Sequence, residues 1–319
     1  MAAIRENILI NAGVRDAFLD GVTALDAELP GLRASDLAQF LTNNNLPLGM
    51  NGIEQDISTY DLFVFWHVIA MSLPLPPGNA AHSGPIFLPW HRMFMIRLEQ
   101  EFQRVLGDPD FGLPYWDWAE DGELAPVQQW QATLWTADWL GESRGRVRTG
   151  AMGNLRVRLA QDAFTGELVS VTPRQLERAA GLSSLSPSLP TKDDVVGARD
   201  QTVYDQSPWS QSVSGHRNVL EGWVDGPQLH NRVHVWIGGD MGPGTSPNDP
   251  VFFLNHCNVD RIWEAWMSQN GPVYAPGAGD GPAGHRLDSA MAALLGAALT
   301  PADVLDPAQW YAYDTLSVA

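Results

Sequence analysis

Four segments of the chain carry the spacing of apolar and polar residues that predicts helices. Residues 60–71 are almost wholly apolar and aromatic, which is typical of a helix buried on most sides. Residues 89–106 place apolar side chains three or four positions apart, with Arg, Glu and Gln on the opposite face. Shorter patterns follow at 229–236 and 250–268, and the last one begins after Asp249, a capping side chain followed by proline. We expect these helices to form an antiparallel four-helix bundle.

The segment from about residue 140 to 215 predicts less regular structure. It is rich in Ser, Pro, Gly and Arg and has weak periodicity, so we expect surface loops and short elements there. The stretch is continuous in character with its neighbours. The expected organisation is therefore a single domain over residues 1–319 with a loop-rich insertion at about 140–215. The expected fold class is mainly α, a four-helix bundle with long loops and a few short strands.

Composition excludes several classes of function. The 19 basic and 37 acidic residues give a formal net charge of −18, which disfavours nucleic acid and anionic membrane surfaces as partners. The single cysteine, Cys257, excludes an internal disulfide framework and CxxC-type sites. No apolar run reaches about 18 residues, the length typical of a transmembrane helix. The first residues lack the pattern of a secretory signal, so we expect a cytoplasmic location, with export alongside a partner protein left open.

Histidines are concentrated on the predicted helices. A bare pair four residues apart, as at 230 and 234, is weak evidence for a metal site because such pairs also occur by coincidence on helix surfaces. An unpaired imidazole inside an apolar helix is costly, however, and each buried histidine needs a partner. One such residue is explained by a hydrogen bond to a carbonyl or a carboxylate, whereas a set of six favours a metal centre. The six lie on or beside the four helices: His67, His82, His91, His230, His234 and His256.

The types of side chain present narrow the choice of metal. No glutamate is followed by histidine three residues later, so a di-iron carboxylate bundle is disfavoured. No HExxH motif occurs, which disfavours a hydrolytic zinc site. Six imidazoles divided three and three suit two copper ions with open coordination positions. Open copper sites in turn indicate chemistry with O2.

Five stretches of sequence carry a family resemblance. They are HSGPIFLPWHRMFMIRLEQEF (82–102), LPYWDW (113–118), LEGW (220–223), LHNRVHVWIGGDM (229–241) and SPNDPVFFLNHCNVDRIWEAW (246–266). Together they closely resemble the two copper-binding regions of the type 3 copper family, and they are most similar to bacterial tyrosinases of the Streptomyces kind. The resemblance extends over nearly the whole chain, from the start around Arg5 to the Tyr-Ala-Tyr sequence at 311–313.

The resemblance implies two copper ions per chain, with O2 as co-substrate and small phenols as substrates. It assigns three histidines to each ion: His67, His82 and His91 to the first, and His230, His234 and His256 to the second. Glu221 and Asn231 match a pair thought to hold a water that takes the proton from a phenol, with a general base acting through that water. His216 and His285 match no ligand position, and we interpret both as surface or structural residues.

Access to the first metal distinguishes the activities within this family. Four glycines in the loop after His234, at 238, 239, 242 and 244, offer no bulky side chain over that site. We expect Val235 and Gly242 to line the route of the substrate, and we expect monophenols to enter. Cys257 follows His256 but points about 100° away around the helix, so we expect a buried inert thiol.

Several functional interpretations remain open from the sequence. The favoured one is a tyrosinase that hydroxylates monophenols and oxidises o-diphenols to o-quinones, in melanin biosynthesis or a secondary-metabolite pathway. The alternative is a catechol oxidase or o-aminophenol oxidase with little monooxygenase activity, and the remoter one is a hemocyanin-like O2 carrier. A copper-delivery partner protein is compatible with this family, and the sequence does not indicate the oligomeric state. Asp260, Arg261 and Asp117 are expected to form structural ion pairs.

Overall fold

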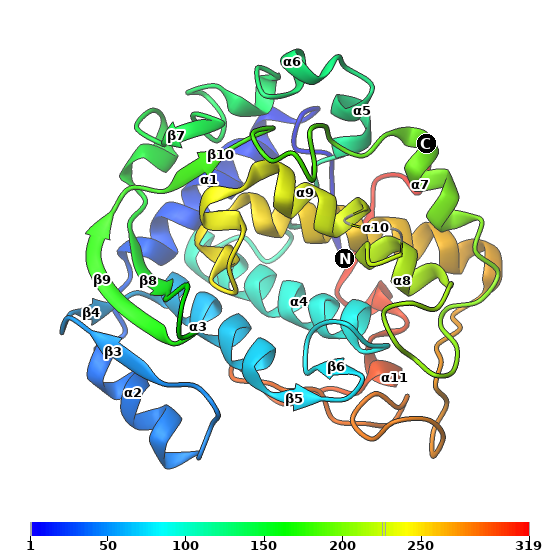
Figure 1. Cartoon of the computed structure of the whole chain (residues 1–319). Coiled ribbons are helices and arrows are strands. Elements are labelled where there is room, and N and C mark those ends of the chain that lie inside the picture. The colour runs from blue at the N-terminus through cyan, green and yellow to red at the C-terminus, as the bar shows by residue number, and fades with distance from the viewer. Residues whose placement is uncertain (1, 225, 227, 319) are drawn as a thin grey trace.

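Four helices lie at the centre of the computed structural model, which describes residues 2–224, 226 and 228–318. These helices are α3 (Thr59–Ser72), α4 (Phe87–Leu106), α9 (Leu229–Ile237) and α10 (Val251–Asn270), shown together in Figure 1. Their positions confirm the predicted bundle and the mainly α fold class. Helix α4 begins two residues earlier than the pattern indicated, because Pro89 is tolerated within the first turn of a helix.

Local sequence signals explain where the central helices begin and end. Ser58 and Asp61 form a capping box at the start of α3, with the Ser58 hydroxyl accepting the Asp61 N–H. Gly107 ends α4 in a left-handed conformation with φ of 65°. The Asp249 carboxylate accepts the Val251 N–H at 3.1 Å, as expected of a capping side chain, but α10 begins at Val251, one residue later than the predicted start at Pro250.

The remaining helices surround this centre. Helix α1 packs against α3 and α4, and α7 and α8 pack against each other. The α-helices are α1 (Ala12–Ala27), α2 (Ala34–Asn43), α5 (Trp118–Gly122), α6 (Pro126–Gln129), α7 (Lys192–Arg199), α8 (His216–Glu221) and α11 (Pro301–Val304). The 3-10 helices are η1 (Thr133–Trp135), η2 (Ala151–Asn154), η3 (Gly239–Met241), η4 (Ser246–Asn248) and η5 (Pro307–Gln309).

Short strands form small sheets around the bundle. In the three-stranded sheet, β9 pairs in parallel with β3 and antiparallel with β8. Three antiparallel pairs join β2 with β4, β5 with β6, and β7 with β10. These strands are β2 (Leu32–Arg33), β3 (Met50–Gly52), β4 (Asp56–Ile57), β5 (Pro74–Leu75), β6 (Gly78–Asn79), β7 (Arg144–Arg146), β8 (Val157–Gln161), β9 (Leu168–Arg174) and β10 (Glu177–Ala179).

The first and last strands of the fold pair with each other. Strand β1 (Ala3–Arg5) runs parallel to β11 (Tyr311–Tyr313), with Ala3 opposite Tyr311. The Arg5 guanidinium lies over the Tyr311 ring, 3.4 Å from its centroid, and its Nε donates to Glu99 at 2.8 Å. The buried guanidinium of Arg5 thus links the first strand of the fold to the last strand.

The predicted insertion at 140–215 contains the expected short elements, but it is not confined to the surface. The Arg178 side chain is buried and donates two hydrogen bonds to Asp249 at the start of α10. Leu159, Leu168 and Leu176 are buried in the same hydrophobic cluster as the central helices. The insertion therefore supports the bundle directly, while the assignment of residues 1–319 to one domain stays a prediction.

No helix of the described residues is both long enough and apolar enough to cross a bilayer.

Candidate metal centre

The first histidine triad joins two helices and one loop. His67 lies on α3, His91 lies on α4, and His82 lies in the loop that connects β6 with α4. All three side chains are buried, and one nitrogen of each lies within 4.8 Å of the others. The structure therefore brings together the three residues that the sequence grouped.

The second triad is built by α9 and α10. His230 and His234 lie one turn apart on α9, which places their rings on one face with centroids 4.5 Å apart. His256 projects from α10, and its Nε2 lies 3.1 Å from the Nε2 of His230. One nitrogen of each again lies within 4.8 Å of the others.

The two triads face each other across a short gap. The rings of His91 and His256 stack with centroids 4.1 Å apart and an interplanar angle of 12°. Phe87 and Phe252 flank this contact, with ring centroids 4.9 Å from His230 and 5.0 Å from His67 respectively. The arrangement is a pair of neighbouring three-imidazole sites with apolar surroundings.

Backbone carbonyls fix the orientation of three of these rings. The Nδ1 atoms of His67, His91 and His234 lie 2.7, 2.9 and 2.8 Å from the carbonyl oxygens of Gly244, Phe87 and Met241. Each Nδ1 therefore donates its proton to a carbonyl, and the lone pair is on Nε2. These three Nε2 atoms are buried and have no hydrogen-bond partner. Metal-binding histidines adopt this arrangement: a hydrogen bond from one ring nitrogen fixes the orientation of the ring, and the other nitrogen is free to bind the metal.

Burial keeps the imidazoles neutral. It lowers the pKa of His67 to about 3 and that of His234 to about 4, because the charged form loses its hydration. Burial first, and then the neighbouring imidazoles, lower the pKa of His82, His91 and His256 well below the usual value. Neutral imidazole is the form that binds a metal ion, so the site is prepared for a cation at neutral pH. Three nitrogen ligands without a thiolate or carboxylate suit copper and leave coordination positions open.

A cavity of about 530 Å³ opens onto both triads. His67 and His82 of the first triad and His230 and His234 of the second contribute to its wall. The other described residues around it are mostly uncharged and small or apolar: Met71, Asn79, Ser83, Trp223, Gly226, Asn231, Val235, Gly242, Pro243 and Ser246. This volume accommodates a single aromatic ring and its substituents.

The cavity contains both residues expected on the access route, Val235 and Gly242. The expectation that Gly238, Gly239 and Gly244 leave the first metal open was wrong, because these three residues do not line the cavity. Gly238 and Gly239 have φ of 60° and 55° and lie against β10, where a side chain on Gly239 would collide with the Glu177 carbonyl. They turn the chain after α9, and Gly244 supports His67 through its carbonyl, so openness at the metal depends on Gly242.

Glu221 and Asn231 lie close to the second triad but in different surroundings. Glu221 is the last residue of α8 and is fully buried, and it does not line the cavity. Burial raises its pKa, against the opposing effect of the Arg217 guanidinium. Asn231 lines the cavity, with its Oδ1 3.0 Å from His230 Nδ1 and its Nδ2 donating to Gly222 O at 3.2 Å. A proton passing from the cavity to Glu221 therefore needs an intermediary such as water.

Other residues singled out by the sequence have structural surroundings. His216 stacks on Trp266, and His285 bonds the Leu75 carbonyl at 2.9 Å, and both are fully buried rather than on the surface. Cys257 is buried as expected, and burial raises the pKa of its thiol to about 12. The expected ion pairs form as well: Asp260 with Arg92 at 2.6 Å, and Arg261 with Asp117 at 3.0 Å.

The sequence did not single out Ser83, Arg217 or Asp205, which form a polar network beside the site. Ser83 N–H donates to Glu221 Oε1 at 2.7 Å, and Arg217 lies between Glu221 and Asp205. The spacing of Arg217 and Glu221, four residues apart in a helical pattern, was a signal for their contact. No sequence signal connected Asp205 with them, because that contact arises from the path of a loop.

Two facing three-histidine sites in a helical bundle define a dinuclear metal protein of the type 3 copper class. A family profile described as the common central domain of tyrosinase matches residues 57–269, which contain all six histidines. The chain belongs to the tyrosinase family.

Individual relatives agree with this assignment. The chain is 37% identical over 265 residues to a tyrosinase of Streptomyces lincolnensis, covering 82% of this chain and 92% of that protein. It is 36% identical over 284 residues to the grixazone synthase of Streptomyces griseus, covering 80% of this chain and 90% of that protein. Among solved structures, a polyphenol oxidase variant from Thermothelomyces thermophila shares the fold with a TM-score of 0.61 at 24% identity, covering 84% of this chain and 70% of that one.

Proposed function

We propose that this protein is a tyrosinase, which uses O2 to hydroxylate monophenols at the ortho carbon and to oxidise the resulting o-diphenols to o-quinones. The observation that carries the proposal is the pair of histidine triads, with buried unpartnered ring nitrogens, opening on one shared cavity. His67, His82 and His91 would hold one copper ion, and His230, His234 and His256 the other. When bound, the copper ions supply activation of O2 and electron exchange with the substrate.

The cavity wall binds and orients the substrate. Met71, Val235 and Pro243 give the cavity apolar surfaces on which a phenol ring packs, and Gly242 leaves room beside His67 and His234. The ring then presents its hydroxyl toward the imidazoles rather than toward solvent. Contact with these surfaces also displaces water from the reacting end of the ring.

Proton transfer is assigned to Glu221 and Asn231. The raised pKa of Glu221 makes it a better proton acceptor than an exposed carboxylate, and its burial requires a water between it and the phenol. Asn231 lines the cavity and is positioned to orient that water. We propose that this pair removes the phenol proton before hydroxylation. The oxidation of a catechol depends less on this step.

A second candidate function is the oxidation of o-aminophenols with little hydroxylation of monophenols. The observation that favours it is the 36% identity to a protein named grixazone synthase. The same six histidines serve both reactions, so the shape of the cavity beside Val235 and Gly242 decides between them.

The deciding experiment is O2 uptake by the copper-loaded chain with a simple monophenol, with the matching catechol and with o-aminophenol. We expect uptake with the monophenol and the catechol. Uptake with catechol or o-aminophenol alone would establish the second candidate. Stable O2 binding without turnover of any of the three would instead indicate a hemocyanin-like carrier.

We also propose a cytoplasmic location, copper delivery by a separate partner protein and a role in melanin biosynthesis. The buried position of the two triads supports copper delivery by a partner protein. Fractionation of the native cells tests the location. Copper content with and without co-expressed neighbouring genes tests copper delivery. Loss of pigment in a deletion strain tests the role in melanin biosynthesis.

A further inference from the structure

His82 has the least local support of the six histidines. The other five lie on α3, α4, α9 and α10, whereas His82 lies in the loop before α4. Within this loop, Asn79 Oδ1 accepts the N–H groups of Ala81 and His82 at 3.0 and 2.8 Å. Helical hydrogen bonds do not hold this ring in place, so its position depends on contacts from other parts of the chain.

Ser83, the residue after His82, has an unusual backbone conformation. Its φ is 64°, in the left-handed region that residues with a side chain rarely adopt. Its N–H donates to Glu221 Oε1 at 2.7 Å, so a carboxylate from α8 holds this conformation. The next residue, Gly84, packs so closely on the His285 ring that a side chain there would collide with it. The turn after His82 is thus fixed by residues from the second half of the chain.

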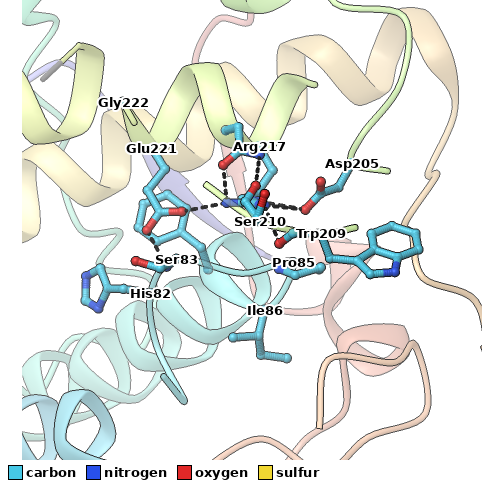
Figure 2. Close-up of polar contacts among 12 residues, drawn as sticks. His82, Ser83, Pro85, Ile86, Asp205, Trp209, Ser210, Arg217, Glu221 and Gly222 are labelled. Atoms are coloured by element: carbon cyan, nitrogen blue, oxygen red, sulfur yellow. Dashed lines mark hydrogen bonds and ion pairs between the residues drawn. The ribbon is translucent and has the colours of Figure 1, made fainter. Parts of the chain in front are cut away.

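Arg217 holds the carboxylate that anchors Ser83. Its Nη1 donates to Glu221 Oε2 at 3.1 Å, while its Nε and Nη2 donate to Asp205 Oδ2 at 2.8 and 2.6 Å. All three side chains have no exposed surface. Figure 2 shows Arg217 between Asp205 and Glu221, with Ser83 and His82 on the other side of Glu221. A buried carboxylate needs such a partner, and the forked guanidinium gives it one fixed direction.

The segment that contains Asp205 contacts the same loop a second time. Tyr204 Oη donates to the Pro85 carbonyl at 2.6 Å, and Arg217 N–H donates to the Tyr204 carbonyl at 3.0 Å. Residues 204–205, α8 and the loop around His82 therefore form one connected hydrogen-bonded unit.

We propose that Arg217, held by Asp205, is a positioning residue for the first histidine triad: by fixing Glu221 it anchors Ser83 and so sets the place of His82. The proposal rests on the proposed function only in taking His82 as a copper ligand. It gives Glu221 a second task besides proton transfer, because one carboxylate oxygen is occupied by the Ser83 N–H and the other by Arg217. It also connects the two metal sites, since the Glu221 carbonyl oxygen lies 3.3 Å from His230 Nδ1.

Amide hydrogen exchange at Ser83, resolved by fragmentation mass spectrometry, tests the anchor in the protein as purified. Arg217→Met removes the guanidinium but keeps a side chain of similar length. We expect exchange at Ser83 to become at least tenfold faster in this variant. The matched control is Arg261→Met, which removes another buried arginine paired with an aspartate, and there we expect the Ser83 rate to stay unchanged. An unchanged rate in Arg217→Met, or an equal increase in Arg261→Met, would overturn the proposal.

Two further variants keep the test decisive if Arg217→Met does not fold. Asp205→Asn retains an oxygen acceptor for Arg217, and we expect a smaller increase in the same direction. Glu221→Gln offers one oxygen to two donors, the Ser83 N–H and the Arg217 guanidinium, so we expect exchange at Ser83 to become faster while hydroxylation of monophenols falls. Unchanged exchange in either variant would contradict the anchor.

Copper release to an excess of chelator provides the functional readout. Residues that orient a metal ligand typically change metal affinity 10- to 100-fold when they are replaced. We expect Arg217→Met to release one of the two copper ions about tenfold faster and the other at an unchanged rate. Equal acceleration of both ions would indicate general loosening and would count against the proposal. If the unmodified chain neither retains copper nor oxidises phenols, the proposed function fails, and amide exchange still decides the anchor.

Discussion

At the scale of single residues, the site depends on which ring nitrogen carries the proton. Gly244, Phe87 and Met241 present carbonyl oxygens to Nδ1 atoms, and none of these carbonyls was visible as a partner in the sequence. The sequence could indicate the six histidines because they lie on or beside the predicted helices and within stretches that resemble the two copper-binding regions of the type 3 copper family. It could not indicate the carbonyl partners or the pairing of Asp205 with Arg217, because both depend on the path of the backbone.

Asn231→Ala tests the division of labour between proton transfer and oxidation. The substitution removes the Oδ1 atom beside His230 and the hydrogen bond from Nδ2 to Gly222. We expect the kcat/KM for monophenol hydroxylation to fall about 100-fold, the lower end of what general acid–base catalysis contributes. Catechol oxidation should fall much less, because the catechol depends less on removal of a proton before binding. Equal losses in the two O2-uptake assays would refute the assigned role.

His216 gives a clean prediction of pH dependence because it lies outside both triads. Burial lowers its pKa to about 4, from a usual value near 6.5. As the pH falls below about 6.5, His216 binds a proton in the unfolded chain but not in the folded chain. The free energy of unfolding therefore decreases until the pH reaches about 4. The free energy of unfolding falls by about 1.4 kcal/mol for each pH unit in this window. At higher pH, His216 contributes little to the pH dependence of stability.

Replacing His216 removes its titration, so comparison with the wild type measures the pH dependence of stability that this residue causes. In His216→Phe an aromatic ring still stacks on Trp266, while the hydrogen bond to the Ala198 carbonyl is lost. We expect the wild type to be the more stable chain at pH 7, and its advantage to shrink by roughly 3 kcal/mol between pH 7 and pH 4. Urea unfolding at a series of pH values measures the difference. A stability gap that stays constant across the series would show that His216 titrates normally.

At the scale of elements, the junction between α8 and α9 controls the distance between Glu221 and the second triad. Gly222 ends α8 with φ of 92°, and a side chain there would collide with the Gln228 carbonyl. Its own carbonyl accepts from Asn231 on the next helix. Gly222 thus ends the helix that carries the proposed base and accepts a hydrogen bond from the helix that carries two of the metal ligands.

Gly222→Ala should destabilise the fold, and Gly197→Ala serves as its matched control. Backbone strain at a positive φ costs about 1–3 kcal/mol, and the collision with Gln228 adds to this loss in the free energy of unfolding. Gly197 lies within α7, has helical geometry and has no atom within 4 Å of an added side chain. Alanine there should raise the free energy of unfolding by about 0.5–1 kcal/mol. Urea denaturation of both variants checks the opposite signs, and equal signs would contradict this account of the junction.

The same scale shows what sequence periodicity can and cannot predict. Helices α3, α4, α9 and α10 were predicted within a few residues, because α3 is an almost wholly apolar run, α4 has apolar side chains three or four positions apart, and Asp249 with Pro250 marks the start of α10. Strands β8 and β9 were not placed, because short strands in a segment rich in Arg and Ser give a weak alternating pattern. The buried position of Arg178 was also missed, since its partner Asp249 lies 71 residues away in the sequence.

At the scale of the whole molecule, copper should stabilise the fold because its proposed ligands come from all four central helices. A ligand that binds only the folded state adds about 4 kcal/mol when its free concentration is 1,000 times its dissociation constant. We expect the copper-loaded chain to unfold at a higher temperature than the copper-free chain in scanning calorimetry. His67→Ala should bind one copper ion instead of two and lose about half of this gain. His216→Phe, which alters a buried histidine outside the triads, should retain both ions, and two ions in His67→Ala would disprove the ligand assignment.

The pairing of β1 with β11 has a consequence for the order of events during protein synthesis. Arg5 contacts Tyr313, which is 308 residues further along the chain. A ribosome adds about 5–20 residues per second, so the partner of Arg5 emerges roughly 15–60 s after Arg5 itself. Asp260 on α10 accepts hydrogen bonds from the hydroxyls of Tyr311 and Tyr313, so the helix that carries His256 also gains these contacts at that time. The contacts of Arg5 and Asp260 with Tyr313 therefore form only after all six histidines have been synthesised.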